Sequence, residues 1–115
     1  MDIHPPVSLD ELADRLLEEA AGHSAQRAAH TLPHPVDGLR QTVIALVGGQ
    51  QLAAHESPGP ASLLVLRGTV RLVSDDRTDL LRAQQISPTP DARHSLHADE
   101  DSVVLLSVAL PQRAD

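Results

Sequence analysis

The chain has 115 residues, of which 41% are hydrophobic, and a formal net charge of −7 at pH 7. This length fits one domain, and no apolar run approaches the roughly 20 residues that a membrane span needs. There is no cysteine, which excludes disulfides and thiolate metal sites. The nine basic residues are all arginine and are scattered, so the basic stripe of nucleic-acid binders is missing. We therefore expect a cytoplasmic protein that binds neither nucleic acids nor membranes.

The chain also contains no Phe, Tyr or Trp. Its core must be built from aliphatic side chains, which bury less area per residue than aromatic ones. Small domains with modest cores often gain stability by association, so the composition favours a homodimer. Any pocket should therefore be lined by aliphatic side chains and a few polar ones.

The first predicted element is an amphipathic helix over residues 8–21. Ser8 and Glu11 have the spacing of a capping box, and Gly22 stands where a helix commonly ends. The apolar residues recur at helical spacing and form one stripe, made of Leu9, Leu12, Ala13, Leu16, Leu17 and Ala20.

Residues 22–38 are rich in His, Pro, Gly and Ala and are interpreted as a connector, with an added edge strand expected near residues 29–32. We therefore divide the chain into a helix and connector (1–38) and a β-barrel (39–115) that form one structural domain. The sequence leaves open the roles of four histidines, namely His4, His23, His30 and His34.

From Leu39 onward, short β-type segments are separated by turn residues and no helical pattern intervenes. The predicted strands are 39–47, 50–55, 61–67, 69–74, 78–83, 93–98 and 102–110. Turns are predicted at 57–60, at Asp75-Asp76 and at 99–101. This pattern indicates a mainly β, antiparallel sandwich or barrel and disfavours a parallel βαβ fold.

The segment from Gly49 to Gly68 resembles the first conserved motif of the cupin family. That motif reads Gly, five residues, His, one residue, His, three or four residues, Glu, six residues, Gly. Gly49, His55 and Gly68 match it in spacing, whereas Ser57 stands in place of the second His and Ala61 in place of the Glu.

The second cupin motif is matched more loosely. It reads Gly, five residues, Pro, one residue, Gly, two residues, His, three residues, Asn. Pro90 matches its Pro, and His94 stands one residue before the expected His. The other three positions are occupied by Gln84, Ala92 and Ala98. The chain therefore resembles a small stand-alone cupin, which implies a double-stranded β-helix, or jelly-roll, barrel with one N-terminal amphipathic helix.

In cupins, the two His and the Glu of the first motif and the His of the second hold a divalent metal. Carried onto this chain, the resemblance leaves only His55 and His94 as metal ligands. Because a transition-metal site usually needs three or four imidazole, thiolate or carboxylate ligands, we expect no metal cofactor.

Strand alternation places His55 with Ser57 on one face, and His94 with Leu96 on one face, while His97 points the other way. In a cupin frame, His55 and His94 are polar anchors inside the barrel and Ser57 is a lesser hydrogen-bonding group. The predicted apolar wall of the ligand pocket consists of Ala61, Leu63, Val65 and Leu96.

These features favour a small-molecule-binding or sensing domain that has no complete metal site and is non-catalytic. One alternative is a metal-dependent cupin enzyme, an oxygenase or isomerase, in which His55 and His94 help to hold iron, manganese, nickel or zinc. Another alternative is a dimeric regulatory or scaffold protein. The barrel fold does not decide among the three, because cupins serve many functions.

Overall fold

The computed structural model describes residues 5–33, 36–55, 59–90 and 92–110, with His55 described by its backbone alone. Its strands form a five-stranded antiparallel sheet, here called sheet A, and a four-stranded antiparallel sheet, sheet B. The elements are α1 (Leu9–Gly22), β1 (Arg27–Thr31), β2 (Leu39–Leu46), β3 (Gln51–His55), β4 (Ala61–Arg67), β5 (Thr69–Ser74), β6 (Arg77–Arg82), β7 (Ile86–Pro88), β8 (His94–Ala98) and β9 (Ser102–Ala109).

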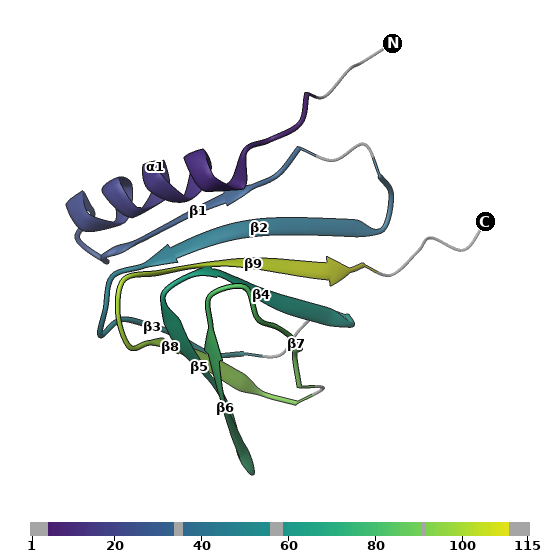
Figure 1. The fold of residues 1–115 in the computed structure, drawn as a ribbon. Coiled ribbons are helices and arrows are strands. Elements are labelled where there is room, and N and C mark those ends of the chain that lie inside the picture. Colours follow the sequence, from purple (N-terminus) through teal and green to yellow (C-terminus); the bar gives the residue numbers. More distant parts are fainter. Residues whose placement is uncertain (1–4, 34–35, 56–58, 91, 111–115) are drawn as a thin grey trace.

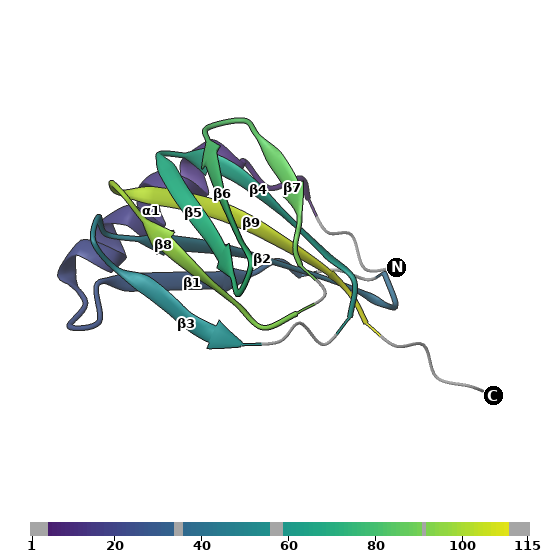
Figure 2. The ribbon, with the colours of Figure 1, turned by 90° about the horizontal axis from the view of Figure 1, so that it is seen from below.

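Sheet A has the strand order β1-β2-β9-β4-β7, and sheet B has the order β3-β8-β5-β6. Figure 1 shows α1 on one side of sheet A and sheet B on the other, and Figure 2 shows sheet B lying across the face of sheet A opposite α1. The predicted class, a mainly antiparallel β fold with one N-terminal helix, is confirmed.

Two segments differ from the sequence expectations. The edge strand of the connector is β1, which begins at Arg27, two residues before the predicted start. The strand β7 was not predicted at all, because its segment runs into a Pro-rich stretch. It pairs with β4 at the edge of sheet A, where a strand can tolerate Pro88.

Helix α1 begins at the predicted cap and packs on the outer face of sheet A. The Ser8 hydroxyl accepts a hydrogen bond from the Glu11 backbone N–H at 3.2 Å. The helix stripe buries Leu12, Ala13, Leu16 and Ala20 against Val43, Ala45 and Val103 of the sheet. Since an isolated helix of this length is marginal in water, this packing is what makes α1 stable. No helix within the described ranges is long and apolar enough to cross a membrane.

Arg67, the last residue of β4, connects the first two turns of α1 to sheet A. Its guanidinium donates hydrogen bonds to the carboxylates of Asp14 and Asp10 and, at 2.9 Å, to the Asp10 carbonyl. These bonds, the one to Asp14 first, raise the pKa of Arg67 above its ordinary value, so the side chain keeps its charge.

Removing this charge should cost only modest stability, because the two carboxylates are 87% and 70% exposed. We expect Arg67→Gln to lower the free energy of unfolding by about 0.5–1 kcal/mol at low salt. Urea unfolding at low and high salt measures this, and the difference should shrink as salt screens the pairs. Arg82→Gln is the matched control, since Arg82 makes no ion pair with any described residue. A loss that is equal at both salt concentrations would contradict the electrostatic origin.

The predicted acidic turn Asp99–Asp101 is exposed, and its side chains connect neighbouring strands at one end of the barrel. Asp99 pairs with Arg71 at 2.9 Å. Glu100 accepts a hydrogen bond from the Thr69 hydroxyl at 2.8 Å, and Asp101 accepts one from the Gly48 backbone N–H at 2.8 Å. All three carboxylates thus have structural partners.

Candidate functional site

His94 is the histidine that the fold buries, at 4% exposure, among the described side chains. It lies on β8 and lines a small cavity between the two sheets. Its Nδ1 is 2.8 Å from the Ala92 carbonyl oxygen, which can only accept, so Nδ1 carries a proton. This bond fixes the orientation of the ring.

The inner cavity that His94 lines is otherwise aliphatic apart from Thr89. Its other lining residues are Ile44, Leu52, Leu63, Leu72, Thr89, Leu96 and Leu106. Its volume is about 20 Å³, which is room for about one water molecule. The barrel interior is therefore packed rather than hollow.

The backbone of His55 lies directly opposite His94. In the pairing of β3 with β8, Leu52 is opposite Leu96 and His55 is opposite His94, with a register shift between the two pairs. Three residue steps on β3 thus match two on β8, which is the signature of a β-bulge. Strict alternation could not reveal this irregularity, although the family motif did place the two histidines together. Ser57 lies outside the described residues.

The four residues predicted to form the apolar wall of the pocket do not all lie at the same place. Leu63 and Leu96 line the inner cavity beside His94. Val65 is completely buried in the core between the sheets but does not line the cavity. Ala61 is half-buried at the start of β4, where its carbonyl accepts hydrogen bonds from the backbone N–H and hydroxyl of Thr89.

The described residues of the inner cavity do not fit the metal site of the cupin family. They offer one imidazole, that of His94, and one hydroxyl, that of Thr89, and Ala61 has no donor atom where the family has a carboxylate. No group of three His, Asp or Glu side chains suited to a metal occurs in the part of the chain that the structure describes.

A much larger hollow, here called the seam hollow, lies where the edge strand of sheet A, β1, and the edge strand of sheet B, β3, meet the end of α1. Its volume is about 740 Å³. It is lined by Glu18, Glu19, Gly22, His23, Arg27, Ala28, Ala29, Ile44 and Leu52. Ile44 and Leu52 also line the inner cavity, so two side chains separate the seam hollow from His94.

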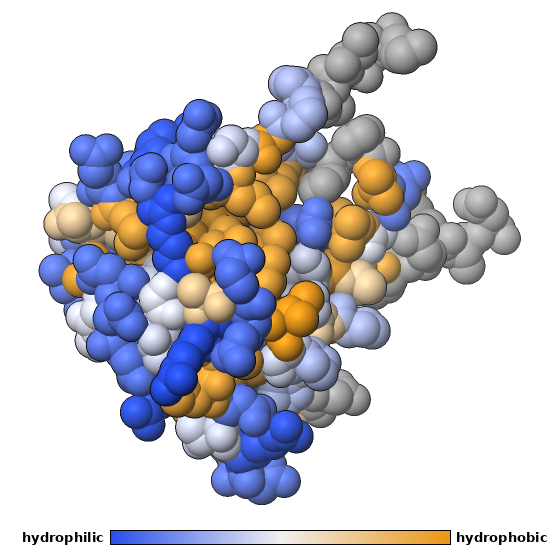
Figure 3. Space-filling view, in the orientation of Figure 1, coloured by the Kyte–Doolittle hydropathy of each residue, from blue (hydrophilic) through white to orange (hydrophobic). Residues whose placement is uncertain are grey.

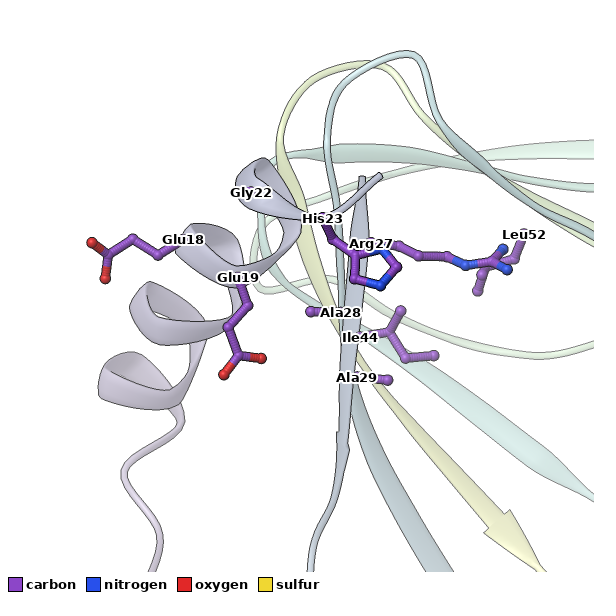
Figure 4. A pocket seen from close by; sticks show the side chains of 9 residues that line it. All are labelled: Glu18, Glu19, Gly22, His23, Arg27, Ala28, Ala29, Ile44 and Leu52. Carbon is purple, nitrogen blue, oxygen red and sulfur yellow. The ribbon is translucent and has the colours of Figure 1, made fainter. Parts of the chain in front are cut away.

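Alternation along β1 divides the seam hollow into two sides. Ala29 pairs with Ile44 on the face toward sheet B, and Arg27 pairs with the buried Leu46 on that same face. Ala28 packs instead with the cluster under α1. Figure 4 shows Arg27 extending on the side of Ile44 and Leu52, whereas Glu18 and Glu19 lie on the helix side of β1.

The turn before β1, at the edge of the seam hollow, is held by two side-chain hydrogen bonds. Gln26 has a left-handed backbone (φ 54°), and its side-chain amide oxygen accepts a hydrogen bond from Gln50 at 2.8 Å. The His23 ring accepts a hydrogen bond at Nδ1 from the Ala25 backbone N–H at 3.0 Å.

Sequence reasoning left the role of His23 open and missed Arg27, Ile44 and Leu52. Each lies in or beside a predicted element, but no local pattern indicates that the edge strands β1 and β3 lie beside one hollow. His30, by contrast, pairs with Val43 on the helix side of sheet A, and so lies away from the barrel interior. His4 and His34 lie outside the described residues.

No protein-family profile matches the sequence, and no curated protein matches it either. Among solved structures, a conserved protein of unknown function from Streptococcus pyogenes is 30% identical, with a TM-score of 0.69. The match covers 79% of this chain and 80% of that one. A cupin superfamily protein from Desulfitobacterium hafniense is 16% identical, with a TM-score of 0.71, over 96% of this chain and 95% of that one.

A similarity to a larger protein is confined to part of that protein. Salicylate 1,2-dioxygenase from Pseudaminobacter salicylatoxidans is 20% identical, with a TM-score of 0.73. The match covers 86% of this chain but only 33% of the dioxygenase, so this chain corresponds to about a third of that enzyme.

Proposed function

Because this chain has the cupin fold and belongs to the same family as the conserved Streptococcus pyogenes protein, we propose that it binds a small molecule in the seam hollow, with His94 at the inner end of the site. The observation that carries this proposal is the sharing of Ile44 and Leu52 between the seam hollow and the inner cavity. The volume of about 740 Å³ lies within the usual range of small-molecule sites. The inner cavity alone is too small for such a ligand.

Binding is tested with Nile red, a neutral apolar dye, in a chain that has no aromatic side chain to contribute fluorescence. We expect the native protein to enhance the dye's emission and Ala29→Trp to abolish most of that enhancement, since a bulky side chain at exposed Ala29 fills the hollow. Excitation above the indole absorption keeps the new Trp silent.

The matched control is Thr78→Trp, which adds the same bulk at an exposed position of the edge strand β6, away from the hollow. It should leave the dye signal unchanged. Equal enhancement by the native protein and by Ala29→Trp would show that the hollow is not the site.

The opposition of His55 and His94 in the β3–β8 register favours the metal-dependent oxygenase or isomerase as a second candidate. We nevertheless expect well under one transition metal per chain, because Ala61 supplies no carboxylate at the family's position. Elemental analysis of native protein after dialysis against a weak chelator checks this. A stoichiometric metal that survives dialysis would favour the enzyme. As a counterpart, Ser57→His combined with Ala61→Glu should raise the affinity for a divalent metal.

We also propose that the protein is a homodimer. The outer face of sheet A carries a row of apolar residues beyond the cover of α1, in which Leu64 pairs with Leu105 on one side and with Ile86 on the other. Ile86 is 65% exposed, and Figure 3 shows apolar side chains gathered on this face beside the helix. Sedimentation at micromolar concentration should therefore give a dimer. A monomer that unfolds cooperatively at high temperature would contradict this and would remove the support for a dimeric scaffold.

A further inference from the structure

We infer that the ligand of the seam hollow is an aliphatic monocarboxylate, held by its carboxylate at Arg27 and His23 with its hydrocarbon body along Ala29, Ile44 and Leu52. This inference rests on the proposed function and assigns the chemical class of its ligand.

The first support is the positive charge of Arg27, on the side of the hollow that faces sheet B. Arg27 makes no ion pair with any residue that the structure describes, so its guanidinium is available to a ligand of the hollow. In a chain of net charge −7, an unpaired guanidinium at the rim of an apolar hollow is a local site for an anion. A guanidinium binds a carboxylate through two parallel N–H···O bonds.

The second support is the donor that His23 offers. Because its Nδ1 accepts a hydrogen bond from the Ala25 N–H, the neutral ring carries its proton on Nε2. Both His23 and Arg27 line the seam hollow, and Figure 4 shows them at the same end of β1. Each side chain therefore offers an N–H donor to an anion in the hollow.

The acidic residues of the hollow do not cancel this site. Glu18 and Glu19 are exposed on α1, on the helix side of β1, while Arg27 extends on the opposite side over the apolar floor. A cationic ligand held at Glu18 and Glu19 would turn away from Ile44 and Leu52. The apolar contacts and the anion site thus lie on one side of the strand, which selects a ligand with both features.

The third support is the nature of the floor. Ala29 is exposed, Ile44 and Leu52 are half-buried, and the chain has no aromatic side chain on which a flat ring could stack. An aliphatic chain suits such a floor, because the hydrophobic effect is non-directional and needs no special geometry of contact.

The inference is tested by displacing Nile red with three eight-carbon probes: octanoate, octan-1-ol and octylammonium. Octanoate should displace the dye from the native protein, and its affinity should fall roughly tenfold in Arg27→Gln, as for a lost charge-assisted hydrogen-bond pair. Octan-1-ol should bind the native protein and Arg27→Gln equally. Arg82→Gln, which removes an exposed and unpaired arginine elsewhere, should leave octanoate binding unchanged.

The possible outcomes distinguish a wrong ligand class from a wrong binding site. If octan-1-ol and octanoate both bind and Arg27→Gln affects neither, the carboxylate assignment is wrong while the binding site stands. Tighter binding of octylammonium than of octanoate would overturn the assignment in the same way. If none of the probes binds and Nile red is insensitive to Ala29→Trp, the proposed function itself fails. Dissociation of a dimer by Ala29→Trp would instead make the hollow an interface between copies.

Discussion

Replacing Gly68 with alanine should destabilise the domain by about 3 kcal/mol or more. Gly68 connects β4 to β5 with a backbone φ of +84°. Residues other than glycine rarely adopt this conformation. An added Cβ would lie 2.2 Å from the Ser102 hydroxyl oxygen and 2.5 Å from the Asp101 carbonyl oxygen. The Ser102 hydroxyl cannot move freely, because it accepts from the Thr69 N–H at 3.1 Å.

Gly49→Ala is the matched control for this substitution. Gly49 also has a positive φ, +91°, but an added Cβ there would meet nothing within 4 Å. Its cost should be about 1 kcal/mol, from backbone strain alone. Both variants are measured by urea unfolding followed by far-ultraviolet circular dichroism, since the chain lacks aromatic fluorescence. Equal losses for the two variants would show that the contact between Gly68 and Ser102 is not tight.

Leu16→Ala should cost about 2–5 kcal/mol, the range for deleting a large side chain from a packed core. Leu16 is 1% exposed and lies between α1 and the outer face of sheet A. Leu17, the next residue, is only partly buried, so Leu17→Ala should cost distinctly less. Urea unfolding of both variants gives the comparison.

A neutral Leu16→Ala would mean that α1 is detached from the barrel in solution. The helix would then be a free arm suited to a partner protein, and the scaffold function would become the leading explanation. The loss of packing and the loss of the Arg67 contacts can be separated, because only the latter depends on salt.

The sequence was informative wherever a local pattern fixes the structure. Ser8 and the leucine stripe located α1, and short β-type segments between turn residues located β4, β5, β8 and β9 to within one residue. Alternation also put His94 and Leu96 on one face, as both line the inner cavity.

What the sequence could not supply depends on contacts between distant segments. The pairing of His55 with His94 requires a bulge that neither strand signals by itself. Arg27 and Leu52 belong to one hollow only because β1 and β3 are the facing edges of two sheets. A hydrophobic pattern gives the face of each residue but not the strand that lies across from it.

The position of β9 in sheet A has a consequence for the biosynthesis of the protein. β9 follows every other strand in the sequence, yet it lies between β2 and β4 and pairs with both. While the chain is being translated, sheet A therefore lacks its middle until residues 102–109 have left the ribosome. During that interval, the edges of β2 and β4 that later pair with β9 have no partner. They are open to wrong pairing, as unpaired strand edges are in folding intermediates. Folding that waits for such long-range pairing is slow, so nascent chains of this protein should depend on chaperones more than chains whose sheets form in sequence order.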